Sequence, residues 1–432
     1  MKTSGSLSKN HQLTAKRQNI SLKRFWLFLA GIPLITGMII SCEEVEAPVL
    51  SYLELETEHN SSESSLHLAD DGTLYLSWIE TDSTKSKLKF STLNTDNTWS
   101  TPTTITSGSN WFVNWADFPS ITSFGDNLTA HYLAKSAEGT YTYDVHLKIS
   151  NDKGKTWNDA FIPHSDGTQS EHGFVSKVAV NNGEVLNVWL DGRQYAYAEQ
   201  DSTITKEMTL RGAIINGNNT ITKEYLLDAR VCDCCQTDTV MTSEGPIVVY
   251  RDRSDQEIRD IYYIKMVDNE WSEPKPIYND YWKINGCPVN GPAIAVKKKT
   301  LGVAWFTLKD GMGEIKAAFS NNNGNSFNIP IKLAYKNPLG RVDIEMIDEY
   351  TALVSWMDMI GDDTVILTQI VNANGSMSNP YEVSKSSESR SSGFPRMAIK
   401  NNFAYMSWTN VGDIIKSIKT AKIDLEQLKE VN

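Results

Sequence analysis

Leu74-Tyr-Leu-Ser-Trp78 is a short apolar segment that ends in an aromatic residue, and six segments of the same kind follow it along the chain. Their closing aromatics lie 51 to 61 positions apart. This spacing is close to one four-stranded propeller blade of roughly 40 to 50 residues plus its loops. The seven closing aromatics are Trp78, Tyr132, Trp189, Tyr250, Trp305, Trp356 and Trp408.

Most of these segments have a second apolar segment just upstream, as Phe118–Ile121 shows, joined through turn pairs such as Asp71-Gly72 and Asn182-Gly183. Such an arrangement predicts β-hairpins. Closure into a ring protects the edges of many short strands, so we predict an all-β, seven-bladed β-propeller in preference to an open stack of sheets. We expect Val49–Glu58 to supply a strand that closes the last blade against the chain after Trp408.

Two segments resemble the Asp-box hairpin of sialidase-type propellers. They are Ser150-Asn-Asp-Lys-Gly-Lys-Thr-Trp157 and, with two weaker positions, Ser320-Asn-Asn-Asn-Gly-Asn-Ser-Phe327. In this hairpin the acid and the hydroxyl bond the turn backbone, while the aromatic packs between strands. The boxes therefore support a sialidase-like fold and mark no active site.

The first 41 residues have the pattern of a lipoprotein signal peptide. Lys23-Arg24 precedes the apolar run Phe25–Ile40, which is short for a membrane span, and Ser41-Cys42 then forms a lipobox. We expect cleavage before Cys42 and lipidation of its thiol; an uncleaved N-terminal anchor is the alternative. The predicted organisation is a signal peptide over 1–41, a tether and closing strand over 42–60, and the propeller over 61–432.

Acidic residues directly after the cysteine, Glu43, Glu44 and Glu46, resemble the export tag of surface lipoproteins in the Bacteroidetes group. The sequence thus predicts an outer-membrane lipoprotein on the cell surface, with the periplasmic face as the alternative. Contact with the membrane would be through the lipid anchor only.

The formal net charge of the chain is -12, and the leader holds six Lys and Arg residues but no acid, so the remainder carries -18. An acidic surface repels nucleic acid, and an anionic substrate must then be held by a local group of cations. With 40% apolar and 10% aromatic residues, disorder and coiled coil are excluded. We expect a monomer.

Four cysteines remain besides Cys42, and they are Cys232, Cys234, Cys235 and Cys287. Four thiolates are what a closed tetrahedral zinc site needs, and a tight loop can direct the first three at one ion. The alternative is a disulfide from Cys232 or Cys234 to Cys287, which an oxidising compartment favours. Either site would be structural, because four sulfur ligands leave no position for a substrate.

Blades two to four hold most of the ionisable residues that packing does not explain. His131 and His146 stand in successive strands, His172 follows Glu171, and Asp191-Gly-Arg193-Gln-Tyr195 precedes a strand that contains Arg211. A single histidine in a strand is more often structural than catalytic, so the combination is what indicates a site.

These residues resemble a known family. The spacing from Tyr195 to Arg211, the two upstream histidines and the Cys-x-Cys-Cys loop are similar to the seven-bladed propeller ulvan lyases of marine bacteria and to a related oligosaccharide dehydratase. The resemblance covers most of the chain after the leader. It implies a structural zinc ion and a groove lined by the catalytic residues Tyr195, His131, His146 and Arg211; we add His172 and Arg193 as substrate-binding residues.

The chemistry agrees with that resemblance. Elimination at carbon 4 of a uronate requires removal of the carbon-5 proton, and the developing enolate needs nearby donors or cations. An arginine can supply these, and a tyrosine beside it can take the proton and return one to the leaving oxygen. We therefore predict a carbon-oxygen lyase that acts on ulvan or ulvan-derived oligosaccharides and releases either sugar or water.

Two other functions stay open. A sialidase-like glycoside hydrolase needs three arginines around the sialate carboxylate, and the Arg-Ile-Pro motif that carries the first of them is absent from the sequence. A glycan-binding surface lipoprotein without catalytic activity would suit the fold equally well.

Overall fold

The structure is a computed structural model that describes residues 49–58, 60–181, 183–333 and 336–430. The predicted signal peptide and Cys42 lie outside the described residues. Within these residues, strands dominate and three short helices occur: α1 (Arg193–Gln200), the 3-10 helix η1 (Arg390–Ser392) and α2 (Leu425–Glu430). None of the described helices is long and apolar enough to span a membrane.

Seven antiparallel sheets follow one another along the chain, and each has an inner strand that lies next to the centre of the ring. The first three sheets include the two that hold the polar residues singled out above. Their strands are β2 (Asn60–Leu68), β3 (Leu74–Thr81), β4 (Ser86–Thr92) and β5 (Thr103–Gly108); β6 (Ile121–Phe124), β7 (Asn127–Lys135) and β8 (Tyr143–Ser150); and β9 (His172–Asn181), β10 (Glu184–Asp191), β11 (Met208–Asn216) and β12 (Ile221–Val231).

Four more sheets complete the set. Their strands are β13 (Asp238–Thr242), β14 (Gly245–Arg251), β15 (Ile261–Val267), β16 (Glu270–Trp271) and β17 (Lys275–Pro276); β18 (Ala293–Lys297), β19 (Thr300–Lys309), β20 (Met312–Ser320) and β21 (Ile331–Lys332); β22 (Pro338–Met346), β23 (Thr351–Ile360), β24 (Asp363–Asn372) and β25 (Tyr381–Ser386); and β26 (Arg396–Lys400), β27 (Phe403–Val411), β28 (Lys416–Asp424) and β1 (Leu50–Leu53).

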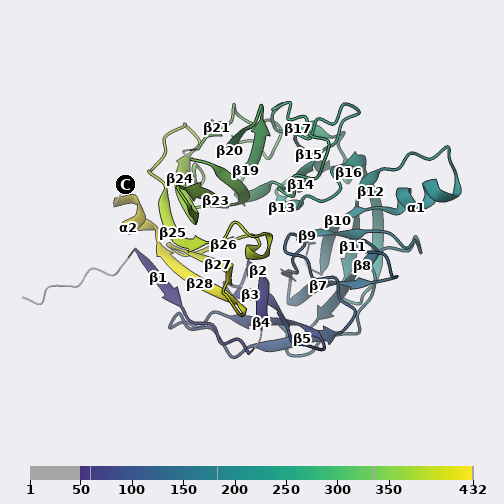
Figure 1. The fold of residues 1–432 in the computed structure, drawn as a ribbon, viewed down its shortest axis with the longest axis horizontal. Coiled ribbons are helices and arrows are strands. Elements are labelled where there is room, and N and C mark those ends of the chain that lie inside the picture. Colours follow the sequence, from purple (N-terminus) through teal and green to yellow (C-terminus); the bar gives the residue numbers. More distant parts are fainter. Residues whose placement is uncertain (1–48, 59, 182, 334–335, 431–432) are drawn as a thin grey trace, which may run out of the picture. The chain divides into compact units, whose positions relative to one another are not determined.

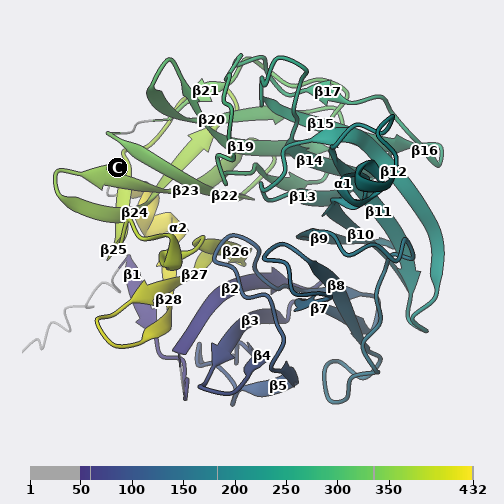
Figure 2. The ribbon, with the colours of Figure 1, turned by 45° about the vertical axis from the view of Figure 1, so that its right-hand side comes forward.

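The inner strands close into a ring. Strands β2, β6, β9, β13, β18, β22 and β26 each contact the next, and β26 contacts β2 again. Figures 1 and 2 show the sheets arranged around this centre. The last sheet is completed from the other end of the chain, since Leu50 of β1 pairs with Ile423 of β28. The predicted seven-bladed propeller and its closing strand are therefore confirmed.

The repeated aromatics occupy the second strand of each sheet and are buried. Five of them are tryptophans that are at most 2% exposed, and Tyr250 and Tyr132 are 0% and 9% exposed. Several indoles also donate to an acid: the bond from Nε1 of Trp189 to Asp191 is 2.8 Å long, and that from Trp356 to Asp358 is 3.0 Å. The repeated aromatic residues thus contribute to the apolar core, and several of them also bind a buried carboxylate near the end of their strand.

The Asp boxes form the expected turns. In the first box, Asp152 accepts from the backbone N–H of Thr156 at 2.8 Å, and Ser150 accepts from the N–H of Gly154, whose φ is +87°. Trp157 packs edge-on against Phe90 of the neighbouring blade. The structural role predicted for the box is confirmed.

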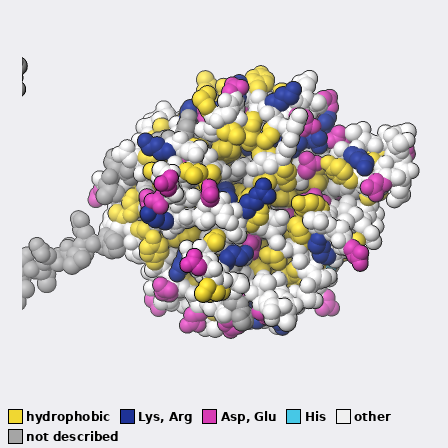
Figure 3. Space-filling view, in the orientation of Figure 1, with side chains coloured by type: hydrophobic (Ala, Val, Ile, Leu, Met, Phe, Trp, Pro, Cys, Tyr) yellow, Lys and Arg dark blue, Asp and Glu magenta, His cyan; other side chains and the backbone are white. Residues whose placement is uncertain are grey.

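Charges of both signs are interspersed over the face of the propeller shown in Figure 3, and no histidine is visible there. This agrees with the burial of the candidate histidines: His131 and His172 are both 0% exposed.

Candidate active site

Helix α1 interrupts the chain between β10 and β11 and carries two tyrosines, Tyr195 and Tyr197. Residues two positions apart on a helix point to opposite sides of it. The structure accordingly gives the two phenols different neighbours, although both belong to the same short helix.

Tyr195 turns toward the loop after β12. Its hydroxyl donates to Oδ1 of Asp233 at 2.6 Å. Burial, followed by the hydrogen bond to Asp233, raises the pKa of Tyr195, and Arg253 opposes that rise only in part. The predicted pairing of Tyr195 with Arg211 is not seen: the charged neighbours of its phenol are Asp233 and Arg253, although its ring packs on the apolar cluster that includes Met208 of β11.

Tyr197 is the tyrosine that is coupled to the arginines at the start of α1 and on β11. Its phenol is coupled electrostatically to Arg193 and to Arg211. Arg211 itself is partly buried, with 20% of its side chain exposed, and burial followed by the repulsion from Arg193 lowers its pKa.

Arg211 has fewer ion-pair contacts with carboxylates than Arg193. Its Nε donates to Thr209 at 3.3 Å and lies 3.9 Å from Oδ1 of Asp191. Its two terminal nitrogens make no hydrogen bond or ion pair with another described residue. A partly buried guanidinium with a free fork is suited to bind a carboxylate bidentately.

Arg193 is already paired. Its Nε and one terminal nitrogen donate to the two oxygens of Asp191, each at 2.7 Å, and the same terminal nitrogen lies 3.3 Å from Asp166. Because Asp191 takes both donors, the structure does not offer this fork to a substrate. Arg193 instead adds positive charge behind Arg211.

His131 and His146 lie on opposite faces of the β7–β8 pair. The register sets His131 opposite Leu147 and Tyr132 opposite His146, and successive residues of a strand point to opposite faces. His146 stacks on Tyr132 and is coupled to Asp144 and His164. His131 is buried on the other face, where its Nδ1 accepts from the N–H of Ser120 at 3.3 Å. The two histidines predicted to line one groove are therefore separated by the pleat.

His172 is fully buried at the start of β9, so it has no surface with which to contact a sugar as predicted. It stacks face to face on His164, with ring centroids 3.8 Å apart. Burial opposes charge on His172, but Asp144 and Asp166 outweigh it and raise its pKa to about 9. His172 belongs to an internal cluster of histidines and aspartates.

A cavity of about 320 Å³ lies on the Tyr195 side of α1, and Tyr141, Glu171 and Asp233 also line it. Glu171 accepts from the hydroxyl of Tyr143 at 2.8 Å. Burial raises the pKa of Glu171 to about 7 and that of the nearby Asp117 to about 8. Carboxyl groups but no lysine or arginine line this cavity, so it is less suited to an anionic sugar than the Arg211 side.

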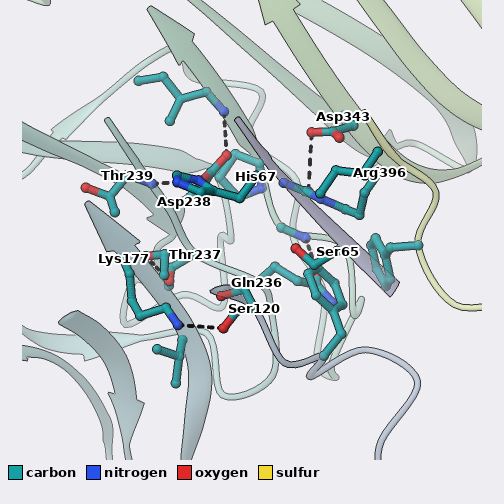
Figure 4. A pocket seen from close by; sticks show the side chains of 18 of the residues that line it. Ser65, His67, Ser120, Lys177, Gln236, Thr237, Asp238, Thr239, Asp343 and Arg396 are labelled. Carbon is teal, nitrogen blue, oxygen red and sulfur yellow. Dashed lines mark hydrogen bonds and ion pairs between the residues drawn. The ribbon is translucent and has the colours of Figure 1, made fainter. Parts of the chain in front are cut away.

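A second cavity, of about 290 Å³, lies among the inner strands and is drawn in Figure 4. Several of its charged residues bond to other residues of the ring: Lys177 donates to the carbonyl of Ser120 at 2.7 Å, and Arg396 lies 3.3 Å from Asp343. Asp238 accepts from the N–H of Ile294 on the next inner strand. We therefore interpret these residues as ties between neighbouring blades.

The four predicted metal-binding cysteines converge. Cys234 and Cys287 are paired as a disulfide, which is one of the two arrangements that the sequence left open. Cys232 and Cys235 are buried thiols with their sulfurs 3.2 Å apart. The sulfurs of Cys232, Cys234 and Cys287 all lie within 4.8 Å of one another.

This donor set also fits a zinc ion, because tetrahedral bonds of about 2.3 Å place sulfurs roughly 3.8 Å apart. Arg259 donates to the sulfur of Cys232 at 3.3 Å. Burial raises the pKa of Cys232, but the neighbouring Cys235 and Arg259 outweigh it and lower that pKa to about 6. The loop can therefore hold a thiolate.

Several residues of this region were missed by sequence reasoning. They are Tyr197 on α1, Asp144 on β8, His164 and Asp166 in the loop before β9, and Asp233 beside Tyr195. Asp144 stands two residues before His146 in one strand, and this spacing places both on one face. No comparable local pattern brings His164 or Asp166 to that face, since they reach it through a loop.

No protein-family model matches the chain, and no curated protein matches it in sequence. Among solved structures, a protein of unknown function from Dyadobacter fermentans is similar at 12% identity with a TM-score of 0.50, over 88% of this chain and 100% of that one.

Two similar structures have been named for their activity. A Trypanosoma rangeli sialidase mutant displaying trans-sialidase activity has 12% identity and a TM-score of 0.47, over 89% of this chain and 61% of that one. The α-L-arabinofuranosidase Arb93A from Fusarium graminearum has 12% identity and a TM-score of 0.46, over 88% and 99%. At such identities the likeness concerns the fold alone, and the chain is a seven-bladed β-propeller.

Proposed function

We propose that the protein is a carbohydrate lyase that eliminates the carbon-4 substituent of a uronate in ulvan or in ulvan-derived oligosaccharides. The observation that carries this proposal is the free guanidinium fork of Arg211, a partly buried side chain that is coupled electrostatically to Tyr197.

Arg211 would hold the uronate carboxylate. Charge moves onto that carboxylate when the carbon-5 proton leaves, so a cation placed there stabilises the transition state more than the ground state. The low local exposure strengthens the interaction, because less water competes for the guanidinium.

Tyr197 would move the protons. A tyrosine can take the carbon-5 proton and return a proton to the leaving oxygen. Tyr197 is the tyrosine coupled electrostatically to Arg193 and Arg211. His146 is the second candidate for one of these transfers. Burial lowers its pKa, although Asp144 opposes the shift, so it is available as a neutral base.

A glycoside hydrolase with a tyrosine nucleophile is the second candidate, and one observation favours it. The hydroxyl of Tyr195 donates to Asp233 at 2.6 Å, and a carboxylate in that position can accept the phenol proton during attack on a sugar. The Tyr195 cavity would then be the active site.

Two buried arginines are not available for the arginine triad that a sialidase needs. Arg251 donates to the carbonyls of Asn290, Arg259 and Phe306 and is 2% exposed. Arg341 is also buried and donates to Ser392 and to nearby carbonyls. Both serve the ring, so they are unavailable for a triad around a sialate carboxylate.

One assay separates these functions. The protein is incubated with ulvan, with ulvan oligosaccharides and with a sialoside, while the absorbance of the unsaturated uronate and the release of sialic acid are followed. A lyase gives the unsaturated product, a sialidase releases sialic acid without it, and a binding protein retains ligand without turnover. Product masses then show whether sugar or water has left.

We also propose that the four cysteines hold a structural zinc ion when the Cys234–Cys287 disulfide is reduced, and that lipidated Cys42 anchors the protein at the outer membrane. The convergence of the sulfurs supports the first proposal. The lipobox supports the second, and metabolic labelling with a fatty acid in wild-type and Cys42→Ala cells tests it.

A further inference from the structure

An exposed tyrosine is held in a strained backbone conformation in the loop between β17 and β18. Tyr281 has a φ of +58°, and among the described residues the only other aromatic residue with a positive φ is Phe174. A bulky side chain rarely adopts this conformation, which persists only where the surrounding structure enforces it. Phe174 is 5% exposed and belongs to the core, whereas Tyr281 is 58% exposed. Burial of the ring therefore does not account for the strain at Tyr281.

Two neighbours fix this conformation. Asp260 accepts from the backbone N–H of Tyr281 at 2.9 Å and from that of Trp282 at 3.1 Å. The ring of Trp282 is buried, packs edge-on against Phe306 and carries the guanidinium of Arg251 at 4.8 Å from its centroid. Because Trp282 is anchored in the core, the loop leaves the neighbouring Tyr281 ring in solvent.

A cation and an apolar side chain accompany the ring. Nζ of Lys309 lies 5.5 Å from the ring centroid of Tyr281, and this ammonium group makes no hydrogen bond or ion pair with another described residue. Met312 is paired with Lys309 across the β19–β20 turn, so both side chains point to one side of the hairpin, and Met312 is 65% exposed. These three residues, Tyr281, Lys309 and Met312, form the Tyr281 patch.

The Tyr281 patch lies on the face of the ring that carries α1. Helix α1 connects the second and third strands of its sheet, β10 and β11, and the Lys309–Met312 turn connects the second and third strands of its own sheet, β19 and β20. Corresponding connections of propeller blades lie on one face. Since α1 belongs to the third sheet and the patch to the fifth, a ligand that contacts both must be a chain of several units.

We propose that the Tyr281 patch binds an anionic sugar residue of a polysaccharide chain, away from the site of the chemistry. The apolar C–H face of a sugar ring can pack on an exposed tyrosine, whose hydroxyl remains available for a hydrogen bond. A sulfate or carboxylate of the same sugar would pair with Lys309, because a lysine ammonium binds such groups as a point charge. The proposal rests on an anionic glycan as the ligand, as proposed above, and it does not require turnover.

Binding of ulvan tests the proposal, because a second contact on the same chain raises the affinity for a polymer that spans both sites. Tyr281→Asn removes the ring, and asparagine tolerates a positive φ, so the loop should keep its conformation. We expect the apparent Kd for ulvan to rise by about 5-fold or more. Affinity electrophoresis in gels that contain ulvan measures it, with gels that contain neutral dextran as the reference.

Tyr350→Asn is the matched control. It removes another exposed tyrosine, which is 65% exposed, from the turn between β22 and β23. These are the first and second strands of their sheet, so Tyr350 lies on the other face of the ring and its loss should leave the affinity for ulvan unchanged.

Lys309 tests the contribution of charge. Lys309→Gln should weaken ulvan binding by about 2-fold to 5-fold at low ionic strength, and high salt should remove the difference. Lys309→Arg keeps the charge and should keep the affinity. Circular dichroism checks the folding of every variant.

Three results would overturn the proposal. They are equal affinity for ulvan in the wild type and in folded Tyr281→Asn, a wild type that does not bind ulvan, and a changed oligomeric state of Tyr281→Asn at unchanged affinity, which would assign the patch to a protein contact. A wild type that binds ulvan without forming an unsaturated product would contradict lyase activity alone, because the affinities of the variants can still be compared.

Discussion

At the scale of single residues, the side chains of Tyr195 and Tyr197 distinguish the proposed lyase from a hydrolase. Tyr195 bonds Asp233, and Tyr197 interacts with Arg193 and Arg211. We predict that Tyr197→Phe lowers the rate of elimination by roughly 100-fold to 10,000-fold, the usual effect of losing a general acid or base, while leaving folding intact.

Tyr195→Phe is the matched control, since it removes a hydroxyl from the same helix, and it should change elimination by less than about 10-fold. Initial rates of unsaturated-uronate formation measure both variants. If Tyr195→Phe is the inactive one, the acidic cavity is the active site and the assignment to Tyr197 fails.

Arg211 gives a second prediction at this scale. Arg211→Gln loses the charge that receives the developing enolate, so we expect kcat/KM to fall by about 100-fold or more, with a large part of the loss in kcat. Arg211→Lys keeps the charge but not the two-nitrogen fork, and it should recover part of the activity. Steady-state kinetics on uronate oligosaccharides check this, and two fully active variants would show that the carboxylate is bound elsewhere.

At the scale of elements, the loop from β12 to β13 holds three of the four cysteines. If zinc occupies the cluster, a chain beginning after Cys42 should show four titratable thiols per chain after denaturation with a chelator, and it should release one zinc ion. A Cys234–Cys287 disulfide leaves two thiols and no cysteine-bound zinc. Thiol titration together with zinc release therefore decides between the two arrangements.

Strand β1 gives the second prediction at this scale. It pairs with β28 over Leu50–Leu53, and the hydroxyl of Tyr52 donates to the carbonyl of Val383 at 3.1 Å. A chain that begins at residue 58 leaves the edge of β28 unpaired, so we expect a loss of roughly 3 to 6 kcal/mol in the free energy of unfolding.

Tyr52→Phe removes only the bond to Val383, and it should cost about 1 kcal/mol or less. Urea unfolding of the truncated chain, Tyr52→Phe and the wild type checks both numbers. An unchanged midpoint after truncation would mean that β1 contributes little to closure.

For the whole molecule, buried carboxyls link stability to pH. Burial raises the pKa of Asp117 to about 8, whereas an unfolded aspartate has a pKa near 4. Between these values the folded chain keeps a proton that the unfolded chain has lost, so the free energy of unfolding falls as pH rises. The slope is up to about 1.4 kcal/mol per pH unit for each such carboxyl.

Asp117→Asn should flatten this dependence between about pH 5 and pH 8. The amide oxygen can still accept from the N–H of Phe174, as Oδ1 does at 2.7 Å. Urea unfolding at several pH values measures the two slopes. Parallel curves for the variant and the wild type would show that Asp117 is ionised in the folded chain.

Much of the fold could be predicted from the sequence, because the buried aromatic and its flanking turns recur in every blade. The site was less predictable, as His131 and His146 show. Their separation depends on the register of β7 against β8, which a one-residue shift would change. The neighbours of Tyr195 and Tyr197 depended on whether their segment is a helix or a strand, because a strand would place both side chains on the same face.

The sequence by itself determined the number of blades, since one buried aromatic recurs in each period, and short strands with exposed edges favour closure into a ring. Only the tertiary structure decided that Tyr197 is the tyrosine coupled to Arg211 and that His164 and Asp166 join Asp144 and His172. These contacts join a helix, a loop and two strands, and their geometry arises only when packing fixes the elements relative to one another.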